Sequence, residues 1–159
     1  MKALVTVLVG TIITFIAEAH TADPLENAYT EIVSLEKVPI IEVSLNGKSA
    51  YFVLDSGSDV SLLHLPDALN FEFSHQKRAS KSIVGASGGN QPLYQASDFE
   101  LLLGQRPLQT MFFATDLATI IESLAASTGI TITGIIGMDL MRKYGFEIDY
   151  LNQRLVLHW

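Results

Sequence analysis

The residues best suited to chemistry in this sequence are a carboxylate and the small residues that follow it, Asp55-Ser56-Gly57-Ser58. They come directly after residues 50–54, which are apolar at every position and therefore predict a strand buried on both faces. An acidic side chain at the end of such a strand is presented from a rigid base. Because Asp, Ser and Gly are also the ordinary residues of any turn, this motif alone is a weak signal.

A second motif, Gly134-Ile135-Ile136-Gly137, leads into Met138-Asp139-Leu140-Met141 further along the chain. The two motifs in this order resemble the retropepsin-like aspartic peptidases, a family that includes single-domain bacterial members. In that family, two apolar residues precede a three-residue motif of Asp, then Ser or Thr, then Gly. Later in the chain, two apolar residues and a Gly lead into a short helix. The resemblance extends from about residue 40 to residue 157, nearly the whole chain after its first residues.

This resemblance implies a mostly β fold, a single-lobe acid-protease barrel with one or two short helices that acts as a homodimer. It also implies an aspartic endopeptidase that needs no cofactor and in which Asp55 of each subunit supplies half of a catalytic pair. The supports of the catalytic turn would be Ser56, Gly57 and Ser58, with the Ser56 hydroxyl bonding across the axis to the partner's loop. The structural brace behind the turn would be Ile135, Ile136 and Gly137.

Paired carboxyls explain why such a family needs these residue types. Hydrolysis by water requires a base for the nucleophile's proton and an acid for the carbonyl oxygen and then the leaving nitrogen. Two adjacent carboxyls cannot both ionise, so they hold one proton between them and can do both tasks. Since the chain contains one Asp-Ser-Gly triplet, the second carboxyl must come from a symmetry-related copy.

The predicted flap over this site is Val84-Gly85-Ala86-Ser87-Gly88-Gly89, a glycine-rich tip between two strand-like arms. Such a hairpin bends at little steric cost and could close over an extended peptide or protein substrate. The substrate would then lie as an added strand between flap and catalytic pair. A plain surface hairpin is the alternative interpretation.

Residues 85–89 also satisfy G-x-S-x-G, the nucleophile elbow of serine hydrolases. That motif requires a helix directly after it, and here Pro92 follows without any helical pattern. No metal site is predicted either, because His20, His64, His75 and His158 show no ligand spacing and each is interpreted as a surface or loop residue. The remaining alternative is an exported dimeric peptide-binding module of the same fold without turnover.

Composition limits the broader class. The chain has 159 residues, 48% of them hydrophobic, which is ample for one domain with a real core. Its formal net charge of −7 repels phosphate backbones, so nucleic acid is not an expected partner. The absence of cysteine excludes disulfides, thiolate metal sites and a cysteine nucleophile.

The first residues predict export. Lys2, the uncharged residues 3–17 and the sequence Ala17-Glu18-Ala19 match a signal peptide, residues 1–19, with cleavage after Ala19. The mature protein would be periplasmic or secreted, without a stable membrane span. An uncleaved anchor is the alternative, although a span normally needs about 20 apolar residues. Residues 20–30 are interpreted as a flexible lead-in and residues 31–159 as the peptidase domain.

Turn residues predict the elements that position the motifs. Asn46-Gly47 favours a type I′ hairpin between strands at 39–45 and 48–54. Further short strands are expected at 60–63, 80–84, 93–103 and 107–114. Apolar spacing predicts a helix over 115–127 ended by Gly129, and a second over 138–144 followed by Gly145. Residues 146–150 and 154–157 predict a final hairpin.

Overall fold

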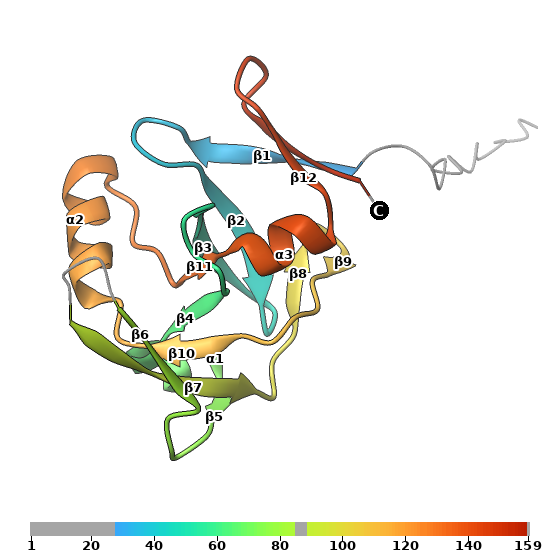
Figure 1. The fold of residues 1–159 in the computed structure, drawn as a ribbon. Coiled ribbons are helices and arrows are strands. Elements are labelled where there is room, and N and C mark those ends of the chain that lie inside the picture. Colours follow the sequence, from blue (N-terminus) through green and yellow to red (C-terminus); the bar gives the residue numbers. More distant parts are fainter. Residues whose placement is uncertain (1–27, 85–88, 159) are drawn as a thin grey trace, which may run out of the picture.

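A computed structural model describes residues 28–84 and 89–158 of the chain. Strands dominate these residues, and the helices among them are short (Figure 1). The strands are β1 (Ala28–Ser34), β2 (Ile40–Leu45), β3 (Lys48–Leu54), β4 (Leu62–His64), β5 (Ser74–His75), β6 (Lys81–Val84), β7 (Asn90–Ser97), β8 (Leu101–Leu103), β9 (Arg106–Pro107), β10 (Phe113–Thr115), β11 (Gly134–Ile136), β12 (Phe146–Asp149) and β13 (Arg154–Leu157). The helices are the 3-10 helix η1 (Leu65–Asp67) and the α-helices α1 (Ala68–Phe71), α2 (Ala118–Thr128) and α3 (Met138–Lys143).

The hairpin β2–β3 confirms the prediction made from Asn46-Gly47. Both residues have positive φ, 50° and 75°, as a type I′ turn requires. The Asn46 side chain also fixes this turn to two neighbouring segments, because its Oδ1 accepts the Glu100 N–H at 2.7 Å and its Nδ2 donates to the Phe71 carbonyl at the end of α1 at 2.8 Å. The register of the strand that leads to Asp55 is therefore fixed at its far end.

The centre of the sheet joins strands that are distant in sequence. β3 pairs in parallel with β11, and β11 pairs antiparallel with β4. Val53 lies opposite Ile135, and Leu54 lies opposite Ile136. Because parallel strands end at the same edge of a sheet, the residues that follow β3 and β11 lie next to each other.

A large apolar core underlies this part of the sheet. In β3, Phe52, Val53 and Leu54 are 0%, 5% and 4% exposed, which confirms the strand predicted to be buried on both faces. The Phe112 ring packs edge-on against the rings of Phe52 and Phe99, with centroids 6.4 and 5.4 Å apart. The strand that carries the candidate carboxylate therefore rests on close-packed side chains.

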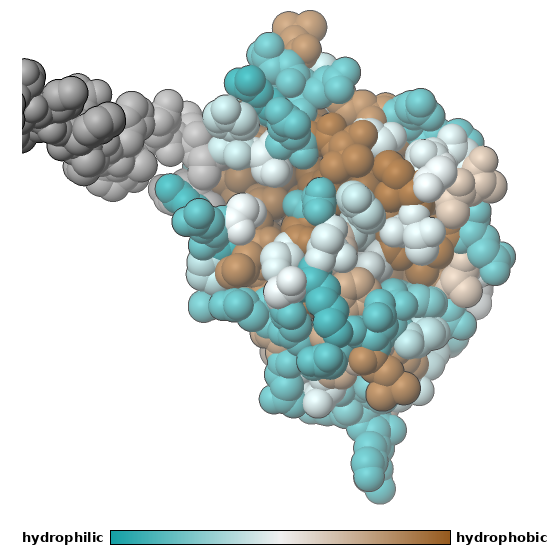
Figure 2. All heavy atoms as spheres, turned by 180° about the vertical axis from the view of Figure 1, so that it is seen from behind, coloured by the Kyte–Doolittle hydropathy of each residue, from teal (hydrophilic) through white to brown (hydrophobic). Residues whose placement is uncertain are grey.

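One edge of the sheet contains the two ends of the described chain. β1 pairs antiparallel with β13, and β13 pairs with β12 (Figure 1). β1 begins at Ala28, so the prediction of a lead-in without regular structure was wrong for residues 28–30. The pairing with the C-terminal strand, which places Ala28 opposite Leu157, is a long-range contact that no local pattern reveals. The turn of the final hairpin projects from the surface (Figure 2), and Leu151 in it is 96% exposed.

Both predicted helices are present, with one shifted start. Gly129 at the end of α2 and Gly145 shortly after α3 have φ of 71° and 54°, as expected for closing glycines. α2 begins at Ala118 instead of Thr115, because Thr115 continues β10 opposite His64. η1 and α1 were not predicted, since they are too short to show a helical period.

Candidate active site

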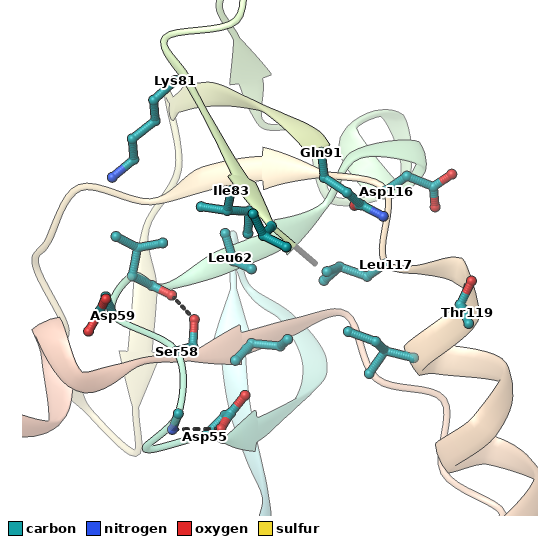
Figure 3. Close-up of a pocket in the computed structure, with 15 residues that line it drawn as sticks. Asp55, Ser58, Asp59, Leu62, Lys81, Ile83, Gln91, Asp116, Leu117 and Thr119 are labelled. Carbon is teal, nitrogen blue, oxygen red and sulfur yellow. Dashed lines mark hydrogen bonds between the residues drawn. The ribbon is translucent and has the colours of Figure 1, made fainter. Parts of the chain in front are cut away.

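Asp55 lies in a tight turn at the end of β3, where backbone groups hold both its main chain and its side chain. Its N–H donates to the Ile136 carbonyl at 3.0 Å, and its own carbonyl accepts the Ser58 N–H at 3.1 Å. The Gly57 N–H donates to Asp55 Oδ1 at 2.8 Å (Figure 3). Asp55 is half-buried, whereas Ser56 and Gly57 are exposed. The turn thus presents one carboxylate in a fixed orientation beside an uncovered stretch of backbone.

Gly57 makes this close approach possible. A Cβ on Gly57 would lie 3.1 Å from Asp55 Oδ1, tighter than most Cβ contacts. A larger residue would therefore require the carboxylate or the turn to shift by a few tenths of an ångström. Ser58 contributes differently. Its hydroxyl donates to the Val60 carbonyl at 2.7 Å and thereby connects the turn to the residues that lead into β4.

The second motif lies directly behind this turn. Ile135 and Ile136 are buried, and the Met138 N–H donates to the Ser58 carbonyl at 2.8 Å. A Cβ on Gly137 would lie 2.6 Å from the Val60 carbonyl oxygen and 2.7 Å from that of Ser58. Only glycine allows the start of α3 to pack this tightly against the turn. The structure therefore brings together the two motifs that the sequence analysis singled out.

A polar cluster that the sequence analysis missed lies beneath the turn. The Ser61 hydroxyl donates to Asp139 Oδ1 at 2.7 Å and accepts the Gly137 N–H at 3.1 Å. The Thr110 hydroxyl donates to Asp139 Oδ2 at 3.3 Å. Ser61 is fully buried in an otherwise apolar run, and a hydroxyl in that position was the available signal.

A cleft of about 650 Å³ opens above Asp55 (Figure 3). Its centre is apolar, and its charged lining residues are Asp55, Asp59, Lys81 and Asp116. The apolar lining side chains are Val60, Leu62, Ile83, Val84, Leu117, Ile120 and Ile135. The cleft therefore combines apolar walls with a carboxylate at its floor, a composition typical of ligand-binding sites.

The predicted flap is partly described. Its arms β6 and β7 pair antiparallel, with Val84 opposite Asn90, and Val84 is 72% exposed at the cleft. Gly85, Ala86, Ser87 and Gly88 lie outside the described residues. A Cβ on Gly89 would meet no atom within 4 Å. Because β7 is a strand directly after the G-x-S-x-G sequence, the strand–turn–helix arrangement of a nucleophile elbow is absent from this segment.

The histidines of the described chain have structural partners. His64 was interpreted as a surface or loop residue, and this was wrong: it lies in β4 with its side chain 12% exposed. Its Nδ1 accepts the Leu117 N–H at 3.0 Å. His158 pairs with Glu147 at 2.9 Å. Within residues 28–84 and 89–158, no three side chains of His, Cys, Asp or Glu cluster to form a metal site.

Two carboxyl groups outside the cleft have shifted pKa values. Burial raises the pKa of Asp67 above its ordinary value, although the neighbouring His64 acts in the opposite direction. The side-chain amide of Asn152, with backbone N–H groups of the same turn, lowers the pKa of Asp149. Neither residue lines the cleft, so their effects concern stability.

The sequence profile of the family described as retroviral aspartyl protease matches residues 35–149, which is more than half of the chain. The chain belongs to this family. The matched range of the retroviral aspartyl protease family includes the Asp55 turn, both arms of the predicted flap and the Gly137 motif.

Solved structures show the fold of this retroviral aspartyl protease family member. EIAV protease complexed with the inhibitor HBY-793 is 22% identical, covers 69% of this chain and 90% of its own, and has a TM-score of 0.52. A retropepsin-like aspartic protease from Rickettsia conorii is 18% identical, covers 83% and 91%, and has a TM-score of 0.55. The retroviral protease-like domain of Ddi1 from Leishmania major is 13% identical, covers 77% and 94%, and has a TM-score of 0.50. The predicted mostly β, retropepsin-like fold is confirmed.

No sequence among curated proteins matches the chain significantly.

Proposed function

We propose that the protein is an aspartic endopeptidase that hydrolyses peptide bonds as a homodimer, with Asp55 of each subunit forming the catalytic pair. The observation that carries this proposal is the Asp55 carboxylate, oriented by the Gly57 N–H at 2.8 Å on the floor of an apolar cleft. Membership of the retroviral aspartyl protease family supports the same chemistry.

The exposed turn supports the dimer. One chain supplies one Asp-Ser-Gly turn, and Ser56 and Gly57 are uncovered in the single chain. A two-fold axis beside Asp55 would bring two such turns together and cover both. The paired carboxyls would share one proton, one activating a water molecule and the other protonating the carbonyl oxygen of the substrate. The Ser56 hydroxyl is then available to bond across the axis.

The substrate would be an extended polypeptide segment. The cleft lies between the β6–β7 hairpin above and the Asp55 turn below, and both bordering elements present strand or turn backbone. An added strand can take backbone hydrogen bonds from them and place alternate side chains on opposite sides. The apolar recess around Leu62, Ile83 and Ile135 would accept an apolar side chain.

The alternative is a peptide-binding module of the same fold without turnover. The two functions are distinguished by comparing wild type with Asp55→Asn, in which one carboxylate oxygen is replaced by an amide nitrogen. Asp55→Asn keeps the side-chain shape and the bond from Gly57 but cannot share a proton. We expect the wild type to cleave a mixed peptide pool with an acid-favoured or bell-shaped pH profile, and the variant to bind peptides without cleaving them. Turnover that is unchanged in Asp55→Asn would refute the proposal.

Asp98→Asn is the matched control for this experiment. Asp98 is exposed, has φ of 57° and lies outside the cleft, and asparagine is well suited to that left-handed conformation. The same chemical change at this position should leave cleavage and folding unaffected. A parallel loss in Asp98→Asn would trace the effect to general damage.

A mixing experiment tests the shared pair directly. Wild type is allowed to exchange subunits with an equal amount of Asp55→Asn, and cleavage is measured at constant wild-type concentration. If one carboxylate per dimer is insufficient, random pairing leaves about half of the wild-type subunits in active dimers, so activity falls to about half. Undiminished activity, or activity of a protein that sediments as a monomer at every concentration, would show that one chain acts alone.

We also propose that the protein is exported and acts in the periplasm or outside the cell, from the signal-peptide pattern of residues 1–19. Sequencing of the mature N-terminus is expected to give His20. None of the helices in the described part of the chain is long and apolar enough to span a membrane. Recovery of the intact N-terminus from the membrane fraction would favour an uncleaved anchor.

A further inference from the structure

Ser61 immediately precedes β4, which is separated by β11 from the strand β3 that leads to the candidate catalytic carboxylate. Ser61 is fully buried. A buried hydroxyl requires partners of its own, and Ser61 has two. It accepts the Gly137 N–H at 3.1 Å and donates to Asp139 Oδ1 at 2.7 Å. The length of the second bond is that of a well-formed O–H···O hydrogen bond.

Asp139 is satisfied by two hydroxyl groups from separate parts of the chain. Oδ1 accepts from Ser61, which precedes β4, and Oδ2 accepts from Thr110 at 3.3 Å in the loop before β10. The carboxylate itself lies in the first turn of α3 and is half-buried. One side chain therefore connects three segments beneath the catalytic turn.

Two contacts join the start of α3 to the turn that holds Asp55. The start of α3 touches the turn through the bond from the Met138 N–H to the Ser58 carbonyl, 2.8 Å long. Gly137 leaves no free space there, because even a Cβ would lie 2.7 Å from the Ser58 oxygen. A shift of α3 relative to β4 is therefore transmitted to residues 55–58.

We propose that Asp139 is a positioning residue of the active site, whose carboxylate fixes Ser61 and thereby the Gly137 motif against the Asp55 turn. This inference rests on the proposed peptidase function, and it assigns Asp139 no contact with substrate. Two carboxyls that share one proton must be held close to their productive geometry, and a displacement of about 1 Å can reduce a rate about 100-fold. This hydroxyl–carboxylate cluster maintains that geometry.

The test compares Asp139→Leu with Asp139→Asn. Leucine has a similar size but accepts no hydrogen bond, so we expect kcat to fall about 10-fold to 100-fold. KM should change little, because the cleft walls come from other elements. Asparagine can still accept from Ser61 through Oδ1 and can donate to the Thr110 oxygen, so it should restore most of the lost kcat. Ser61→Ala removes the same link with a smaller change and provides a second variant if Asp139→Leu folds poorly.

The readouts separate positioning from simple stability. All variants are assayed well below their melting temperatures, with the fraction of dimer measured for each. Combining Ser61→Ala with Asp139→Leu should add little to the larger single effect, because both break one connection. The pH profile of the leucine variant should shift relative to wild type, since the geometry of the proton-sharing pair has changed.

The outcomes also distinguish this inference from the proposed function. If wild type and Asp98→Asn cleave peptides but the leucine and alanine variants keep the wild-type kcat and pH profile, Asp139 has no positioning role. An equal loss in the asparagine and leucine variants would overturn the hydrogen-bond argument. If wild type itself does not cleave, the proposed function fails first, and the inference fails with it.

Discussion

Gly137→Ala is the substitution whose effect follows most directly from the structure. The added methyl group would lie 2.6 Å from the Val60 carbonyl oxygen and 2.7 Å from the Ser58 oxygen, where ordinary contacts need more than 3 Å. Both obstacles are backbone atoms, so no side-chain rotation can relieve them. The start of α3 and the Asp55 turn must move apart.

The size of the effect can be estimated from overpacked cores, where an extra methyl group costs about 1–3 kcal/mol. We expect the upper end, because separation also weakens the bonds of Gly137 to Ser61 and of Met138 to Ser58. For a domain of this size about 3 kcal/mol lowers the melting temperature by roughly 6–12 °C. A turn displaced by about 1 Å should additionally reduce kcat about 100-fold.

Thermal denaturation and peptide cleavage at a temperature well below both transitions test the two expectations separately. Gly89→Ala is the matched control for folding, since a Cβ there meets nothing within 4 Å and the residue lacks a positive φ. Gly89→Ala should retain the wild-type melting temperature. A Gly137→Ala protein that keeps both its melting temperature and its kcat would refute the claim that backbone contact at this point sets the geometry of Asp55.

The two shifted carboxyl groups give opposite predictions for stability against pH, both measurable by calorimetry. Asp67→Asn should raise the melting temperature at pH 7 but not below about pH 4. Burial raises the pKa of Asp67, so the ionised carboxylate destabilises the fold once the pH exceeds the ordinary pKa of an aspartate. An unchanged melting temperature at pH 7 would contradict this. Asp149→Ala should lower the melting temperature at pH 7. Hydrogen bonds, first of all from the Asn152 side chain, lower the pKa of Asp149, so its stabilising effect is present above the ordinary pKa and is lost as the pH falls through the lowered one. A deficit that persists unchanged at pH 2 would speak against that assignment.

Local signals in the sequence predicted the parts of the fold that local physics determines. Asn46-Gly47 specified its turn because few residues tolerate two consecutive positive φ angles. Gly129 and Gly145 follow helices because glycine adopts even a single positive φ more readily than other residues. The uniformly apolar residues 50–54 predicted a strand buried on both faces. These signals depend on neighbours within a few residues.

Long-range pairing was beyond such signals. The segment before residue 31 shows no periodicity, yet Ala28 pairs with Leu157 across the length of the chain. The bond between Ser61 and Asp139 joins residues 78 positions apart, and no local pattern near either residue indicates the other. The family resemblance placed Gly137 behind the turn, but the reason for glycine there became visible only with the carbonyl groups of Ser58 and Val60.

The start of α3 shows how the site departs from what stability alone would favour. Helices are usually capped by Ser, Thr, Asp or Asn, which stabilise them by about 1 kcal/mol, yet the capping position of α3 is Gly137, which has no side chain to cap it. Its φ of −94° does not require glycine, so the helix itself could accept a better capping residue. The Met138 N–H, which has no acceptor within the helix, donates to the Ser58 carbonyl of the Asp55 turn. A substitution that improves an isolated helix should therefore destabilise this protein, because the capping side chain would occupy the space through which helix and turn are joined.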